Sequence, residues 1–78
     1  MKCYIFGTGE YSKMYSPHVP DDCIVAYVDN DRNKTGSIFR GKLVILPEEM
    51  GIDSVDYVFV FVNRCEDIIS QVKGIGFP

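Results

Sequence analysis

The sequence has few of the residues that most often carry catalysis or bind metals. It contains no tryptophan, a single histidine (His18) and three cysteines in 78 residues. Cys3, Cys23 and Cys65 form no Cys-x-x-Cys pair and have no zinc-ligand spacing with the histidine. No serine, cysteine or lysine is placed to form a recognisable catalytic dyad with it. We therefore expect no catalytic residue, no metal site and no independent enzyme activity.

Long hydrophobic runs and clusters of basic residues are also absent. The longest apolar run, Tyr-Val-Phe-Val-Phe-Val at 57–62, is far too short to cross a bilayer. The net charge is −3 without a Lys/Arg cluster, whereas nucleic-acid binding needs several convergent cations. These absences argue against membrane insertion and against nucleic acid as a partner. The odd cysteine count and the lack of a secretory signal predict a cytoplasmic protein.

The residues that are present predict one small α/β domain spanning 1–78. Hydrophobic residues make up 46% of the chain, which is typical of a globular protein. Apolar runs predict strands at 2–6, 23–28, 43–45 and 56–62. Helices are expected at 10–16, at 47–50, and after Asn63, which we expect to cap the last helix together with Glu66. This order predicts a Rossmann-like three-layer domain with a parallel sheet of about four strands in the order 3-2-1-4.

The fourth strand of this arrangement would be an apolar edge. A long apolar edge favours aggregation unless another strand pairs with it or covers it. The chain is therefore expected to be either a piece of a longer protein or a domain whose edge a partner completes. The partners expected on this basis are a second copy of the chain or an attached catalytic domain.

A glycine-containing loop follows the first expected strand, in the order Gly7, Thr8, Gly9, Glu10, Tyr11 and Ser12. Two glycines let a backbone turn tightly and approach a ligand closely, and a following helix start favours an anion. The carboxylate of Glu10 opposes this interpretation, because it would repel a pyrophosphate. On the loop alone, a phosphate site and a simple strand–helix turn remain equally good explanations.

Acidic and amide residues follow the second expected strand, at Asp29, Asn30 and Asp31. Asp29 stands twenty residues after Gly9, where an acid can accept hydrogen bonds from ribose hydroxyls. These residue types are also common in turns. Together, the loop and the acid predict a small-molecule nucleotide ligand. Arg32 and Lys34 could meet a 2′-phosphate, but we expect them to lie on a solvated turn.

The stretch from Val25 to Met50 has the features of a known family. It resembles the N-terminal domain of bacterial sugar O- and N-acetyltransferases of the left-handed β-helix type. It is also similar to the nucleotide-binding domain of polysaccharide-biosynthesis nucleotide-sugar epimerases and dehydratases. The positions that carry the resemblance are Gly7, Gly9, Asp29, Asn30, Gly36, Gly41, Val44 and Pro47 to Glu49.

The resemblance implies a module that binds a nucleotide-sugar or NAD and lacks the catalytic domain of such proteins. It implies that the Gly7–Gly9 loop lies near phosphates and that Asp29, Asn30 and Asp31 lie near ribose or base. A structural or protein-interaction domain with an empty loop and a pairing edge strand is the alternative. A receiver-like signalling domain is disfavoured, because glycines rather than an acidic pair follow the first strand.

Overall fold

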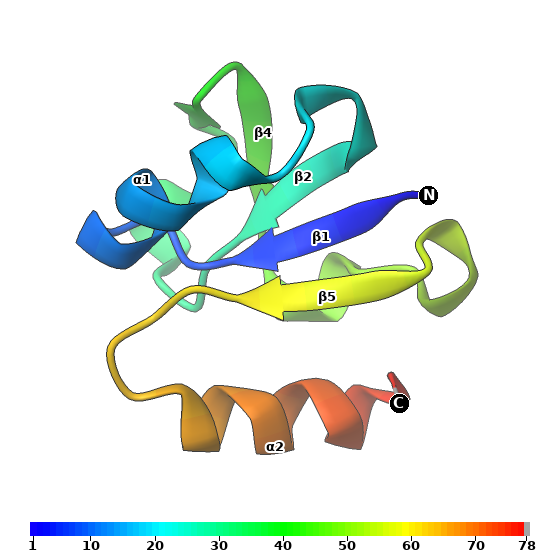
Figure 1. Ribbon diagram of the computed structural model, residues 1–78. Helices are drawn as coiled ribbons and strands as arrows, with labels where there is room; N and C mark the ends of the chain where they lie inside the picture. The colour runs from blue at the N-terminus through cyan, green and yellow to red at the C-terminus, as the bar shows by residue number, and fades with distance from the viewer. Residues whose placement is uncertain (78) are drawn as a thin grey trace.

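The computed structural model describes residues 1–77 and shows one sheet with α1 and α2 on its opposite sides (Figure 1). Parallel strands joined through short helical connections form most of the sheet. The strands and α-helices, in chain order, are β1 (Cys3–Phe6), α1 (Glu10–Tyr15), β2 (Ile24–Val28), β3 (Ile38–Phe39), β4 (Lys42–Ile45), β5 (Tyr57–Val60) and α2 (Cys65–Ile75).

The strands β1, β2 and β5 end at the same edge of the sheet. The strand order is β3-β4-β2-β1-β5, with β1 parallel to both β2 and β5. Phe6 at the end of β1 is in register with Val28 at the end of β2 and with Val60 at the end of β5. The segments that follow these three strands are therefore brought together, where ligands bind in open α/β sheets.

The predicted fold class is wrong, because the sheet has an additional strand and is mixed rather than purely parallel. Instead of a Rossmann-like domain with about four parallel strands in the order 3-2-1-4, the chain forms a mixed sheet of five strands, in which β3 is antiparallel to β4. The cause is a two-residue hairpin at Arg40 and Gly41, whose φ angles are 51° and 83°. Such turns need positive φ at both positions. Arg40 Nε also donates to the hydroxyl of Tyr27 at 3.1 Å, which helps to hold the turn.

Two of the predicted helices also differ from those observed. The segment Pro47–Glu49 forms only a single 3₁₀ turn, because Met50 returns to an extended conformation with φ −68° and ψ 132°. The last helix begins at Cys65, so Arg64 rather than Asn63 is its N-cap residue, and no side-chain hydrogen bond caps it. The predicted capping pair of Asn63 and Glu66 does not form.

Alternation along the strands produces two separate hydrophobic clusters, one on each face of the sheet. Tyr4 and Phe6 of β1 face α2, where they pack in a cluster with Val72. Cys3 and Ile5 of the same strand belong to the cluster on the α1 side. Because successive residues of β1 are buried on both faces, this strand is held firmly and positions the loop that follows it.

Within residues 1–77, neither α-helix has the length and apolar character needed to span a membrane. The three cysteines are all free thiols.

Candidate functional site

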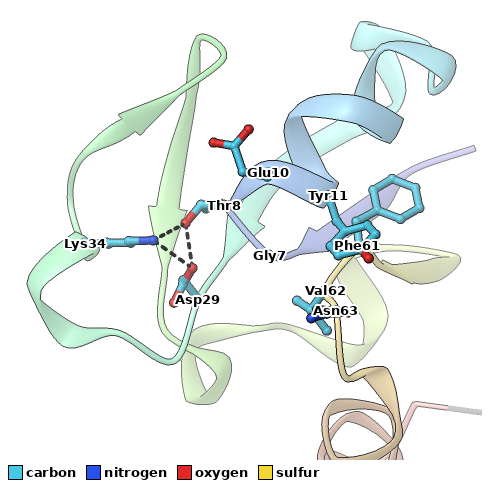
Figure 2. Close-up of a pocket in the computed structure, with 10 residues that line it drawn as sticks. Gly7, Thr8, Glu10, Tyr11, Asp29, Lys34, Phe61, Val62 and Asn63 are labelled. Carbon is cyan, nitrogen blue, oxygen red and sulfur yellow. Dashed lines mark hydrogen bonds and ion pairs between the residues drawn. The ribbon is translucent and has the colours of Figure 1, made fainter.

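A cavity of about 410 Å³ opens where β1, β2 and β5 end (Figure 2). Its walls come from the loop after β1, the polar turn after β2 and the segment after β5. The residues that line it are Gly7, Thr8, Gly9, Glu10, Tyr11, Asp29, Lys34, Phe61, Val62 and Asn63. Ligand pockets usually measure about 300–1,000 Å³, so this cavity is at the small end of that range.

Gly7 allows the loop to pass close to the segment after β5. Its φ is +122°, a conformation that other L-residues rarely adopt. A Cβ atom at Gly7 would lie 2.5 Å from the carbonyl oxygen of Phe61. Its amide also donates to the carbonyl of Val28 at 2.7 Å, which joins the loop to the end of β2. The fold itself therefore requires glycine at this position.

Gly9 is not required by the fold in the same way. Its φ is −99°, which any residue can adopt, and a Cβ atom there would meet no atom within 4 Å. It is the N-cap residue of α1, and it lines the cavity. Glycine at this position therefore leaves open space at the pocket wall, and a larger residue would not clash with the rest of the fold.

A compact polar cluster of Thr8, Asp29 and Lys34 forms one end of the cavity (Figure 2). The Thr8 hydroxyl donates to Asp29 Oδ2 at 2.5 Å. The Lys34 ammonium donates to Thr8 Oγ1 at 3.1 Å and lies 3.7 Å from Asp29 Oδ2. Thr8 is buried and the Asp29 side chain is only 18% exposed, so water screens the hydrogen bond between these two residues weakly.

Aromatic side chains form another wall of the cavity. Tyr11 and Phe61 line it, and the ring of Tyr15 lies between them in the structure. The ring centroids of Tyr11 and Tyr15 are 6.1 Å apart with nearly parallel planes, and those of Tyr15 and Phe61 are 5.8 Å apart. Such a row offers apolar faces on which a planar or sugar ring can pack.

The negative charge of Glu10 has a weaker effect on the cavity than the sequence predicts. Its side chain is 87% exposed, and Oε1 lies 3.3 Å from the ammonium of Lys13. This i,i+3 pair is exposed and solvent-screened. The six-residue helix that begins at Glu10 also has a small dipole, so neither group dominates the electrostatics of the cavity.

Three of the predicted site residues lie outside the cavity. Ser12 is fully buried and its hydroxyl lies 3.0 Å from that of Ser16, so it serves the packing of α1. Asn30 instead exchanges two hydrogen bonds with Gln71 of α2, at 2.9 and 3.1 Å. Asp31 caps the turn that follows β2, because its Oδ1 accepts from the Asn33 amide at 3.0 Å.

The other predicted residues all line the cavity, namely Gly7, Thr8, Gly9, Glu10, Tyr11 and Asp29. Sequence reasoning missed Lys34, Phe61, Val62 and Asn63. The last three follow β5 directly, and the parallel arrangement of β1 and β5 was the signal that could have placed them. The sequence predicts that Lys34 lies on a solvated turn, but its side chain reaches back to Thr8.

Two observations on the described residues concern metal ligands and the reactivity of thiols. Among these residues, no group of three or more histidine, cysteine, aspartate or glutamate side chains could hold a metal ion. Cys3 is fully buried, and its burial, together with the nearby thiol of Cys23, raises its pKa. A raised pKa leaves less of the nucleophilic thiolate at neutral pH.

Comparison with known proteins places the chain in a family. No curated protein matches the sequence, and no solved structure does so either. A protein-family model described as C2185-like, N-terminal, matches residues 1–78, the whole length of the chain. The chain therefore belongs to the C2185-like, N-terminal family.

Proposed function

We propose that the chain is a nucleotide- or nucleotide-sugar-binding module of a carbohydrate-biosynthesis protein. The observation that carries this proposal is the position of Asp29. Its carboxylate lies at the carboxyl end of β2 in the same cavity as the Gly7–Gly9 loop. A carboxylate there can accept hydrogen bonds from vicinal hydroxyls of a ribose or another sugar.

The other walls of the cavity suit the rest of such a ligand. Tyr11 and Phe61 supply apolar ring faces for a base or a sugar. The open space beside Gly9 lets a ligand approach the backbone closely. The volume of about 410 Å³ suits a mononucleotide, or one part of a nucleotide-sugar or of NAD.

The assignment to carbohydrate biosynthesis, and in particular to surface polysaccharides, rests on the resemblance of Val25–Met50 to sugar acetyltransferases and nucleotide-sugar epimerases. The description of the matched family as N-terminal agrees with a module that precedes a catalytic domain. The module itself then binds the ligand, and the attached domain carries out the reaction.

A thermal-shift comparison tests this proposal. Uridine nucleotides, nucleotide-sugars, NAD and NADP are added to the wild-type chain and to an Asp29→Asn variant. A ligand at one hundred times its dissociation constant should stabilise the wild type by about 2.7 kcal/mol. The Asn variant should lose most of this shift, because an amide presents only one acceptor oxygen to the hydroxyls.

An Asp31→Asn variant is the matched control. Asp31 lies two residues further along, outside the cavity, and an amide oxygen can still accept from the Asn33 amide. This variant should keep the wild-type ligand response. If saturating ligands of every class leave the melting temperature of the wild type unchanged, the nucleotide-binding function is wrong.

A second candidate function is a structural or protein-interaction domain that pairs through β5. This strand is the last in the sheet, and within residues 1–77 it pairs only with β1. Its four residues, Tyr57–Val60, are all half-buried rather than buried. Tyr57, Phe59 and Phe61 form a row of contacting rings beside the edge, with centroid distances of 4.9 and 5.4 Å. The partner would be a second copy or an attached domain, and the cavity would stay empty.

A further inference from the structure

We propose a more specific ligand class for the cavity, an inference that rests on the nucleotide-binding function proposed above. The ligand carries a phosphate monoester next to a free hydroxyl, as in a ribose 2′- or 3′-phosphate. Lys34 binds the phosphate, and Asp29 accepts the hydrogen bond from the hydroxyl.

Lys34 is the reason for placing a phosphate at this end. It is the only residue with a cationic side chain among the described residues that line the cavity. Its ammonium has three N–H donors, of which one is directed to Thr8 Oγ1 at 3.1 Å. The ammonium is 3.7 Å from Asp29 Oδ2, which is an ion-pair distance rather than a full hydrogen bond. The side chain is 45% exposed, so donors remain available for a ligand.

Asp29 keeps capacity to accept a further hydrogen bond beside this cation. Its Oδ2 accepts from the Thr8 hydroxyl at 2.5 Å, and its Oδ1 accepts from the Asp31 amide at 2.9 Å. Each carboxylate oxygen has a second lone pair. An acceptor and a cationic donor therefore stand side by side, and a ligand matches both when a hydroxyl and a phosphate occupy neighbouring atoms. An unmodified vicinal diol matches Asp29 but leaves the charge of Lys34 unused.

The turn that carries Lys34 holds it in place before any ligand arrives. The Lys34 amide donates to the carbonyl of Asp31 at 3.0 Å, and its own carbonyl accepts from the Ser37 amide at 3.1 Å. The hydroxyl of Ser37 donates to the same carbonyl. A preorganised backbone lowers the entropy that binding costs.

The other end of the cavity is a poorer place for the phosphate. Among the described residues, no cationic side chain lines the cavity near Glu10, and α1, which begins there, has only six residues and therefore a small dipole. Charge-assisted hydrogen bonds from an ammonium to phosphate oxygens are about twice as strong as neutral ones. The electrostatics of the cavity therefore favour the phosphate at Lys34 and the apolar ring near Tyr11.

Titration calorimetry with matched ligands tests the inference. The probes are adenosine, its 5′-phosphate, its 2′-phosphate and its 3′-phosphate, with the same series for uridine. In the wild type, the 2′- or the 3′-phosphate should bind about tenfold tighter than the nucleoside and the 5′-phosphate, which is the gain expected from a hydrogen bond to a charged group. A Lys34→Gln variant should lose this preference but still bind the nucleoside.

Arg32→Gln is the matched control. Arg32 lies on the same turn, is 73% exposed and pairs with Glu48 at 2.8 Å, but it does not line the cavity. This variant should keep the preference for the 2′- or 3′-phosphate. Melting curves without ligand verify that both variants are folded.

The possible failures separate the two proposals. Equal affinity for phosphorylated and unphosphorylated ligands in the wild type would overturn the phosphate class and leave nucleotide binding standing. A preference that survives in Lys34→Gln would overturn the role of Lys34. The absence of any binding, by nucleosides, nucleotides, nucleotide-sugars and NAD alike, would overturn the proposed function and this inference with it.

Discussion

The carbonyl oxygen of Phe61 lies 2.5 Å from the position that a Cβ atom would occupy on Gly7. This close approach joins two walls of the cavity, because Gly7 begins the loop after β1 and Phe61 follows β5. The contact is made by backbone atoms, which have little freedom to move aside. The shape of the cavity therefore depends on Gly7, because any side chain at this position would separate the two walls.

Alanine at Gly7 should affect stability far more than alanine at Gly9. Gly7→Ala combines a disfavoured φ with a backbone clash and should lower the free energy of unfolding by about 2–4 kcal/mol. Gly9→Ala should change it by less than about 1 kcal/mol, because its φ is ordinary and its surroundings are open. Urea denaturation measures both. Ligand affinity should nevertheless fall in Gly9→Ala, and an unchanged affinity there would argue that no ligand approaches this part of the loop.

The hydroxyl of Thr8 should matter more than its size suggests. Thr8→Val keeps the shape but removes the donor to Asp29 and the acceptor for Lys34. We expect a loss of about 1–2 kcal/mol in the free energy of unfolding, since the partners are partly buried. Thr8→Ser, which keeps the hydroxyl, should recover most of the stability. A larger loss in Thr8→Ser than in Thr8→Val would mean that the methyl group, not the hydrogen bonds, is what stabilises this site.

Stability should decrease at alkaline pH. Burial raises the pKa of Cys3, and the nearby Cys23 thiol raises it further. The pKa of Tyr57 is also raised, mainly by loss of hydration. The nearby charges of Cys3, Cys23 and Asp56 raise it further. A raised pKa in the folded state gives a contribution that is complete below the ordinary value and is lost as the pH rises through the folded value. The free energy of unfolding should therefore fall above about pH 8.5, and more steeply above about pH 10.

Urea titrations across this pH range, with a reducing agent present, measure the effect. Cys3→Ala should flatten the first part of the decrease, while Cys65→Ala, in α2 and outside the Cys3 cluster, should keep it. A free energy of unfolding that stays constant from pH 8 to pH 11 in the wild type would contradict the raised pKa values of Cys3 and Tyr57.

Self-association through β5 is expected if the interaction function is correct. Sedimentation should then show a fraction of dimer that increases with protein concentration. Tyr57→Lys should reduce them, because lysine on an edge strand disfavours pairing with another chain. Ile69→Lys, at an exposed position of α2, is the control and should leave association unchanged. A wild type that remains monomeric at every concentration would exclude pairing between copies.

Most of the strands could be predicted from the sequence because apolar runs report burial directly. The strand runs of β1 and β2, and the acid at Asp29, were placed within a residue or two of where they lie. The strand β3 was missed, because its pairing depends on positive φ at Arg40, a residue that seldom signals such a turn. Without that hairpin, the sequence could not predict that the sheet is mixed.

The predicted site differs from the observed cavity where side chains reach over a distance. Lys34 follows a turn of polar residues, and nothing local distinguishes it from Arg32, yet only Lys34 reaches Thr8. The opposite difference concerns Ser12 and Asn30, which do not line the cavity although their neighbours in sequence suggest a ligand. Ser12 bonds within α1 and its extension, and Asn30 pairs across 41 positions with Gln71. Partners at that separation leave no periodic pattern in the sequence.

The paired amides of Asn30 and Gln71 connect α2 to the segment that carries Asp29. Asn30 is covalently next to Asp29, while Gln71 lies in the middle of α2, on the far side of the sheet from α1 (Figure 1). An occupant that holds Asp29 still would also restrain this amide pair. Amide protons of α2 should then exchange more slowly with solvent, although α2 touches no occupant. A helix on the opposite face would thus report whether the pocket is filled.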